Sequence, residues 1–484
     1  MKSRKLMAVI FASMLLLNAC SDNDNDNGNT TSGTPSFNPI GGGLAVLDIA
    51  SMELEAIVPL PTTMTTDVDG NPTISRFVHT YMDPDNEYLW MNNDGVDNAV
   101  DSAFRIDVDP ASPDYLSHNE IVVGHGHKKS AFAYPSVNTP SAMNLFVTHN
   151  LQEQSISIID NDPVSTTFLE VLDTVELSNG IPFQNTVHGM GFSTVSGHIY
   201  TGVTPGVDKA VSIIDATDPA LGRTLIMAGM AADQIPAAGY VKVSHDGRWV
   251  MTVGYVNETG YLSIIDATTD TVTDVIDLGN LSASSFNIAD MDMGMGMRHM
   301  KIFIPSRQTT ASETEITNQI AVVDFDHMTG MQTAATAVRY IDVGEGPDHR
   351  NGEITEDGFF AYYPNGGDCG DHHGVHGPGC QTISVIDVMM ETVIGTLTTE
   401  GHEPGSVSVF NATDVDPAAT EKFYIFATDH EGYINVYTHN SDDTFSEAIT
   451  PIQPLNLNGE TISVREPHLA NGKLFVPIGS GVVQ

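Results

Sequence analysis

The chain has 484 residues, of which 62 are Asp or Glu and only 19 are Lys or Arg, so its formal net charge is -43 at pH 7. A chain this acidic is repelled by nucleic acids and by anionic lipid surfaces, which excludes a nucleic-acid partner. Such a surface keeps a protein soluble in salty surroundings and is not in itself evidence of a cation-binding role.

The N-terminus has the pattern of an export signal. Lys2, Arg4 and Lys5 precede an apolar run over residues 6–17 that is too short to span a bilayer. The run closes on Leu-Asn-Ala-Cys at residues 17–20, which resembles the lipobox of bacterial lipoproteins. The resemblance implies a signal peptide over residues 1–20 and a lipid on Cys20. We therefore expect a membrane-anchored protein of the bacterial cell envelope, on the outer membrane, facing the periplasm or the cell surface.

A polar segment follows the lipobox. Residues 21–38 are rich in Asn, Asp, Thr, Ser and Gly and contain few apolar side chains. Such a composition cannot offset the entropy of ordering the chain. We expect a disordered acidic tether over 21–38 and one folded domain over 39–484.

A short β-branched run that ends in Asp recurs along the folded domain at intervals of about fifty to sixty residues. The copies are 44–48, 104–107, 156–160, 211–215, 262–266, 320–324 and 383–387, with a degenerate copy at 433–437. Most are preceded by a second apolar run, and before that often comes a turn such as Ser-His-Asp-Gly at 244–247. This order resembles the YVTN-type β-propeller repeat, a relative of WD40 repeats, and implies one four-stranded blade per copy.

The two ends of the domain each supply half of a repeat. Residues 44–60 contain the last two strands of a blade, and residues 464–479 contain the first two. Pairing them would complete one blade and close the ring, which removes open sheet edges. We predict an all-β, eight-bladed propeller, with seven blades as the alternative count. In architecture it is similar to the haem-d1 propeller of nitrite reductases, although no haem ligand can be transferred residue by residue.

The expected strand register sorts the histidines by face. In a propeller, strands A to D run from the axis to the rim, so the D-to-A and B-to-C loops lie on one face. Twelve of the 18 histidines map there, including His149 near a B-to-C loop. Those expected near the axial mouth are His79, His127, His188, His349 and His468. Clustered neutral imidazoles suit copper, another transition metal or haem iron, whereas the alternative is that they bond backbone groups.

The most site-like stretch is Cys-Gly-Asp-His-His-Gly-Val-His-Gly-Pro-Gly-Cys at 369–380, an insertion in a B-to-C loop. Because Cys20 carries lipid, Cys369 and Cys380 are expected to form a disulfide in an oxidising compartment. The loop then offers metal ligands from Asp371, His372, His373 and His376. A Cys2His2 zinc site and a pinned surface loop without a metal role are the alternatives.

A methionine stripe is a further candidate. Met291, Met293, Met295 and Met297 point the same way in an extended strand, and thioethers bind Cu(I). Methionine is also ordinary filler between packed sheets, and this packing role is the favoured interpretation.

Several sequence motifs of enzymes are absent. The chain has no Cys-x-x-Cys-His motif for a c-type haem, no Gly-x-Ser-x-Gly elbow and no phosphate-binding Gly-Lys-Ser/Thr loop. We expect a binding or scaffold module that meets a protein or small-ligand partner through its His-rich loop face. The alternative is a copper- or haem-dependent periplasmic oxidoreductase with an external electron donor, in which haem d1 ranks below copper. The sequence leaves open whether the protein is an enzyme.

Overall fold

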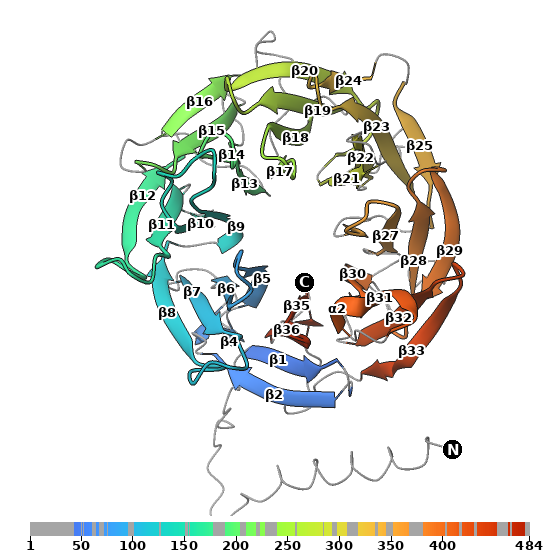
Figure 1. Ribbon diagram of the computed structural model, residues 1–484, viewed down its shortest axis with the longest axis horizontal. Helices are drawn as coiled ribbons and strands as arrows, with labels where there is room; N and C mark the ends of the chain where they lie inside the picture. Colours follow the sequence, from blue (N-terminus) through green and yellow to red (C-terminus); the bar gives the residue numbers. More distant parts are fainter. Residues whose placement is uncertain are drawn as a thin grey trace, which may run out of the picture. The chain divides into compact units, whose positions relative to one another are not determined.

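Eight antiparallel sheets of four or five strands surround a central axis in the computed structural model of the protein (Figure 1). This arrangement confirms the predicted all-β, eight-bladed propeller. The chain divides into two units, Met1–Pro39 and Ile40–Gln484, and every described residue belongs to the second. The structure describes residues 43–49, 51, 53–60, 64–66, 72–74, 76–94, 101–124, 127–150, 153, 155–177, 189–203, 210–218, 223–227, 240–256, 259–283, 285–292, 298–306, 318–333, 337–344, 352–366, 381–401, 404–415, 419–429, 433–452, 463–464 and 467–479.

Blades 2 to 8 are each built from consecutive strands, ordered from the axis to the rim. Blades 2 to 4 contain β5 (Arg76–Met82), β6 (Tyr88–Asp94), β7 (Asp101–Asp107) and β8 (His118–Val123); β9 (His127–Ala133), β10 (Leu145–Asn150), β11 (Ser155–Asp160) and β12 (Val171–Glu176); and β13 (Met190–Phe192), β14 (His198–Val203), β15 (Ala210–Asp215) and β16 (Arg223–Met227). Blades 5 and 6 contain β17 (Tyr240–Val243), β18 (Trp249–Val256), β19 (Thr259–Asp266) and β20 (Thr271–Asp277); and β21 (Asn287–Asp292), β22 (Arg298–Pro305), β23 (Gln319–Asp326), β24 (Met331–Gln332) and β25 (Arg339–Asp342). Blades 7 and 8 contain β26 (Glu353–Ile354), β27 (Phe360–Asn365), β28 (Thr382–Asp387) and β29 (Thr392–Thr398); and β30 (Pro404–Asn411), β31 (Glu421–Asp429), β32 (Ile434–Asn440) and β33 (Phe445–Ile452), with a short helix α2 (Ala412–Val415). A separate hairpin joins β3 (Met64–Thr66) to β4 (Pro72–Ile74).

Blade 1 is shared by the two ends of the domain. β1 (Gly43–Asp48) pairs with β2 (Glu53–Pro59) on one side and with β36 (Lys473–Gly479) on the other. The inner edge of β36 pairs with β34 (Ser463–Val464) and β35 (His468–Ala470). The predicted ring closure is therefore confirmed.

The apolar residues of each repeat form the contacts between blades. In β19, Leu262 and Ile264 pack against blade 6, whereas Ile265 packs against residues of blade 4. Successive side chains of a strand point to opposite faces, so a strand that is buried on both faces reads as a continuous apolar run. This is why the repeat reads Ser-Ile-Ile rather than alternating apolar with polar residues.

In most blades, the aspartate that closes the repeat forms the turn to the outermost strand. The Oδ1 atom of Asp160 accepts a hydrogen bond from the backbone N–H of Asp162 at 2.9 Å, and Asp215 and Asp266 bond Thr217 and Thr268 in the same way. Such a side chain stabilises a turn without constraining the rest of the sequence. In blade 6, β23 continues for two residues past Asp324, and Asp326 accepts the backbone hydrogen bond of the turn instead.

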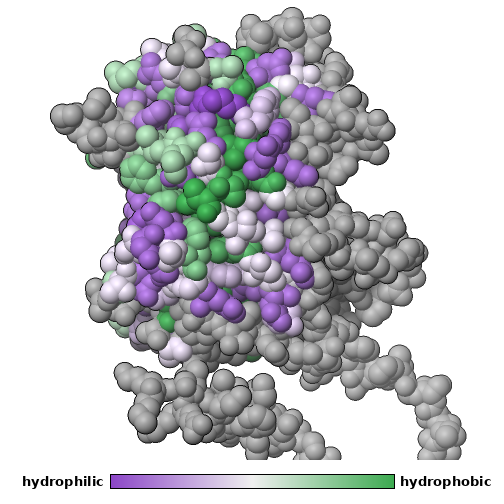
Figure 2. All heavy atoms as spheres, turned by 90° about the vertical axis from the view of Figure 1, so that its right-hand side faces the viewer, coloured by the Kyte–Doolittle hydropathy of each residue, from purple (hydrophilic) through white to green (hydrophobic). Residues whose placement is uncertain are grey.

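The rim over β25 and β29 faces the viewer in Figure 2, where hydrophobic side chains gather near the middle of the view between hydrophilic ones. The exposed apolar side chains of β29 and of the turn before it include Met389, Met390 and Val393. Among the described residues, no helix is long and apolar enough to span a membrane.

Candidate functional site

The described histidines occupy the strand positions that the register predicts. His79 lies in β5, His127 begins β9, and His468 begins β35, all innermost strands. The Nε2 atom of His468 donates to the backbone carbonyl of Thr80 at 3.0 Å, which links blade 1 to blade 2. This nitrogen is therefore engaged by the backbone, as in the alternative interpretation of the axial histidines.

Other polar side chains continue from His79 around the inner wall. Its Nδ1 atom lies 3.2 Å from Lys129 Nζ, on the innermost strand of blade 3. Lys129 Nζ in turn lies 5.9 Å from the centre of the Tyr240 ring in blade 5, and Lys242 Nζ lies 5.6 Å from the same centre. Two ammonium groups from different blades thus lie near one aromatic ring on the innermost strands.

The polar chain extends into the following two blades. Lys242 Nζ donates to Asn287 Oδ1 of blade 6 at 2.6 Å. The amide nitrogen of Asn287 donates to the carbonyl of Gly352 at 2.7 Å and lies 3.2 Å from the hydroxyl of Tyr363, both in blade 7. These contacts fix the position of the Lys242 ammonium group.

The inner wall carries positive charge in a protein that otherwise has very little. Lys129 and Lys242 are half-buried, and a partly buried charge is screened less by salt than an exposed one. Such a pair attracts carboxylate or phosphate groups and can bond them through charge-assisted hydrogen bonds. Neither lysine was predicted as a site residue from the sequence, where the search for ligands centred on the histidines. The signal that could have revealed them is the presence of basic residues on the predicted innermost strands of a chain that contains few basic residues.

His149 is not available to a ligand. It is 1% exposed in β10, and its Nε2 atom contacts the Thr201 hydroxyl of blade 4. Burial lowers the pKa of this imidazole to about 3, so the ring is neutral at physiological pH. Its Nδ1 atom has no hydrogen-bond partner among the described residues. His149 therefore joins blades 3 and 4 and does not contribute to the loop face.

Several predicted site residues lie outside the described residues. These are Cys20, His188, His349, Cys369, Asp371, His372, His373, His376 and Cys380, together with the side chain of His127. Residues 367–380 connect β27 to β28 in blade 7, so the expected insertion is in a B-to-C connection. In the part of the chain that the structure describes, no three His, Cys, Asp or Glu side chains are grouped to hold a metal ion.

Only the first methionine of the predicted stripe can be placed. Met291 is fully buried and packs in the cluster between blades 6 and 7, with Phe303 and Tyr363. The residues 293–297 lie outside the described part of the chain. For Met291 the packing role holds.

The fold and the inner wall define the class of this protein as an eight-bladed propeller with a partly cationic axial lining. Neither a family model nor a curated protein matches the sequence. Among solved structures, it is similar to the dihydro-haem d1 dehydrogenase NirN in complex with DHE, at 12% identity and a TM-score of 0.54, over 87% of this chain and 75% of that one. It also matches Kuenenia stuttgartiensis hydrazine synthase (13% identity, TM-score 0.46, 78% and 96% covered) and the Cps50 (Swd1) propeller domain of Myceliophteria thermophila (8%, 0.44, 87% and 100%). At these identities the likeness concerns the fold alone.

Proposed function

We propose that this protein is a lipid-anchored binding propeller of the bacterial cell envelope, which takes up an anionic ligand at the axial mouth of its loop face. The observation that carries the proposal is the pair of ammonium groups, Lys129 and Lys242, at 5.9 and 5.6 Å from the centre of the Tyr240 ring. The pattern from Lys2 to Cys20 supports the anchor, and the two cysteines of the 369–380 loop fit an oxidising compartment.

The neutral partner of Lys242 favours binding over a purely structural role for this lysine. A structural cation in an acidic protein would be expected to pair with a carboxylate, as Lys473 does with Asp48 at 2.5 Å. Lys242 is instead bonded to a neutral amide, and Lys129 approaches an imidazole. The Lys242 charge thus lies against a neutral amide, which leaves it to attract an anion.

A titration with citrate tests this proposal. Citrate is a compact tricarboxylate, and its binding to the signal-less domain can be measured by calorimetry at low salt. We expect the double variant K129Q/K242Q to bind citrate about 100-fold more weakly, since each lost charge-assisted hydrogen bond contributes at least about 1.4 kcal/mol. The matched control is R248Q, which removes a half-buried cation from the turn before β18 on the opposite face.

The comparison with this control shows which results would contradict the proposed anion site. We expect R248Q to bind citrate as the wild type does, because Arg248 lies at the opposite end of the strands from the loop face. If wild type fails to bind citrate, or if K129Q/K242Q binds it equally well, the anion site is wrong.

A copper- or haem-dependent oxidoreductase is the second candidate. It is favoured by the His-rich insertion 369–380, which connects β27 to β28, and the similar NirN structure is that of a dihydro-haem d1 dehydrogenase. The test is elemental analysis and a visible spectrum of the protein purified from metal-replete periplasm. Stoichiometric copper or a Soret band would favour this candidate, and loss of copper in H372A/H373A/H376A would assign it to the loop. A colourless, metal-free folded protein would exclude both cofactors.

A further inference from the structure

One side-chain position joins neighbouring blades on the face opposite the His-rich loops. It is the residue of the second strand that pairs with the repeat aspartate of the third strand. In three successive blades this residue makes a polar contact with the next blade's turn between its third and fourth strands. The pairs are His198 Nδ1 with Asp270 Oδ2 at 3.2 Å, Trp249 Nε1 with the carbonyl of His327 at 2.7 Å, and Lys301 Nζ with Glu391 Oε1 at 2.5 Å.

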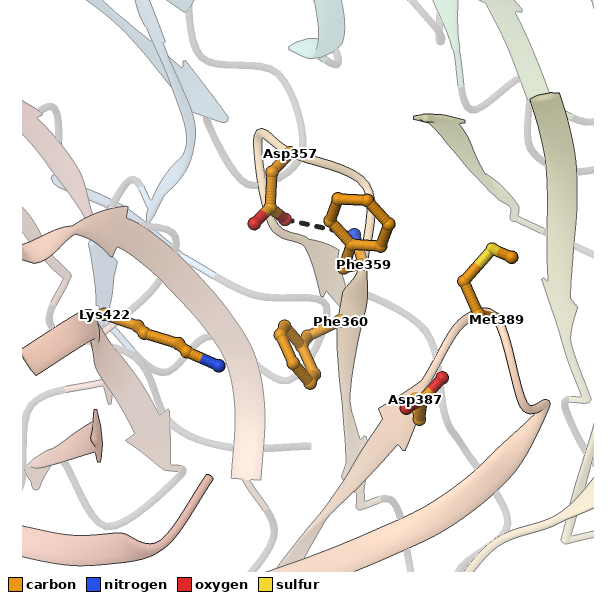
Figure 3. A pocket seen from close by; sticks show the side chains of 6 residues that line it. All are labelled: Asp357, Phe359, Phe360, Asp387, Met389 and Lys422. Carbon is orange, nitrogen blue, oxygen red and sulfur yellow. Dashed lines mark hydrogen bonds between the residues drawn. The ribbon is translucent and has the colours of Figure 1, made fainter. Parts of the chain in front are cut away.

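Blade 7 breaks this pattern. Its corresponding residue is Phe360, which pairs with Asp387 and has no hydrogen-bonding group. The ring instead packs edge-on against His439 of blade 8, with 4.5 Å between centroids. A pocket of 260 Å³ lies at this junction. Its lining is shown in Figure 3 and consists of Asp357, Phe359, Phe360, Asp387, Met389 and Lys422.

Both carboxylates of the pocket have one oxygen engaged by their own turn. Asp357 Oδ1 accepts from the backbone N–H of Phe359 at 3.0 Å and from the Thr355 hydroxyl at 2.6 Å. Asp387 Oδ1 accepts from the backbone N–H of Met390 at 2.7 Å. No hydrogen bond from the described residues reaches Oδ2 of either group. Each carboxylate therefore keeps one acceptor oxygen for a ligand.

The lysine in the pocket is already neutralised. Lys422 Nζ donates to Asp443 Oδ1 at 2.5 Å, and its ammonium group lies 5.1 Å from the centre of the Phe360 ring. Asp443 also accepts from His439 Nε2 at 3.1 Å. Burial lowers the pKa of His439, which stays neutral and accepts a hydrogen bond from the Tyr362 hydroxyl on Nδ1. With Lys422 paired, the two remaining carboxylates make the pocket negative.

We propose that this pocket binds a primary ammonium group carried on an alkyl stem. The site is separate from the proposed anion site, since it opens on the opposite face. Asp357 or Asp387 supplies an acceptor for the ammonium hydrogens while the other adds negative charge to the pocket, and the Phe359 and Phe360 rings favour a cation by their quadrupoles. The Met389 side chain gives the alkyl stem an apolar contact. This chemistry occurs in free alkylamines and in lysine side chains of a partner protein.

The experiment is a calorimetric titration of the signal-less domain with two probes, n-pentylamine and Nα-acetyl-lysine methylamide, with sodium pentanoate as the anionic counterpart. We expect the ammonium probes to bind and pentanoate not to bind. D357N/D387N should weaken binding at least tenfold. Asparagine keeps the Oδ1 acceptor of each turn, so the variant removes charge while preserving the turns.

Blade 5 offers a matched control variant. Asp246 and Asp266 occupy the same two turn positions there, with Oδ1 bonded to the backbone N–H groups of Arg248 and Thr268. D246N/D266N therefore makes the same chemical change away from the pocket, and we expect it to bind the probes as wild type does. A melting temperature within about 2 °C of the control shows that D357N/D387N is folded.

The outcomes separate the two sources of the ligand. Binding of both probes assigns a lysine side chain, and binding of n-pentylamine alone assigns free amines. Binding of neither probe overturns the proposal. Equal weakening by D357N/D387N and D246N/D266N, or equal binding of pentanoate, would also overturn it. None of these results depends on citrate binding at the axial mouth.

Discussion

Replacement of Glu391 by Gln tests whether charge holds blades 6 and 7 together. Glu391 lies in the turn before β29 and bonds Lys301 Nζ at 2.5 Å and two nitrogens of Arg339, each at 2.5 Å. The Lys301 side chain is 5% exposed, and its other partner is the carbonyl of Val388 at 3.0 Å. E391Q keeps the shape of the side chain and removes its negative charge. Lys301 is then left as a buried cation with neutral partners.

The expected loss in unfolding free energy is about 3 kcal/mol, which is at the lower end of the range for breaking a buried ion pair. The loss is not larger because Gln still offers one acceptor oxygen and Arg339 keeps its contact with Asp324. Urea unfolding followed by tryptophan fluorescence measures this loss, since Trp90 and Trp249 are both buried. The double variant K301M/E391L should lie within about 1 kcal/mol of wild type, because it removes both charges together. A loss below about 0.5 kcal/mol in E391Q would refute the argument.

The same network predicts a dependence on pH. Burial raises the pKa of Glu391, but hydrogen bonds from Arg339 and Lys301 outweigh it, so the pKa lies below its ordinary value of 4.5. The stabilisation is therefore complete above the unfolded pKa and is lost as the pH falls through the folded one. Below that range, wild type and E391Q should converge in stability.

Three further predictions concern other parts of the ring. The pKa of His149 is about 3 in the folded protein and 6.5 in the unfolded chain, so the free energy of unfolding of wild type should fall by about 2 kcal/mol between pH 7 and pH 5 relative to that of H149Q. Urea titrations at each pH measure this difference, and parallel pH curves for the two proteins would contradict it. Deletion of residues 473–484 removes β36 from between β1 and β35, so no cooperative unfolding transition should remain by circular dichroism. Peptide mapping without reductant should recover Cys369 and Cys380 in one linked fragment, and recovery of both as free thiols would exclude the disulfide.

The fold could be predicted because its signal is repeated. Most copies carry the same buried strand and end in the same aspartate, so errors in one repeat are corrected by the others. The ring closure also followed from counting, since 44–60 and 464–479 each hold half a blade. Blade 6 departs from the pattern because β23 continues two residues past Asp324, which a short motif cannot reveal.

The sites were harder to predict because they depend on contacts between blades. Lys129 and Tyr240 are far apart in sequence, and the contact between them exists only once the ring has formed. His149 shows the opposite problem, since it maps to the loop face by register but is buried against Thr201. Register gives the strand end at which a residue lies, but not the exposure of its side chain.

The junctions between blades show how a repeat protein acquires distinct sites without changing its fold. The backbone pairing is the same at His198, Trp249, Lys301 and Phe360, so the blade does not depend on which side chain stands there. The side chain alone decides whether the junction is filled, charged or open. Trp249 fills its junction so closely that a Cβ on Gly330 would lie 2.1 Å from the indole. F360W should therefore close the pocket between blades 7 and 8 and abolish ammonium binding. The free energy of unfolding of the propeller should stay near that of wild type.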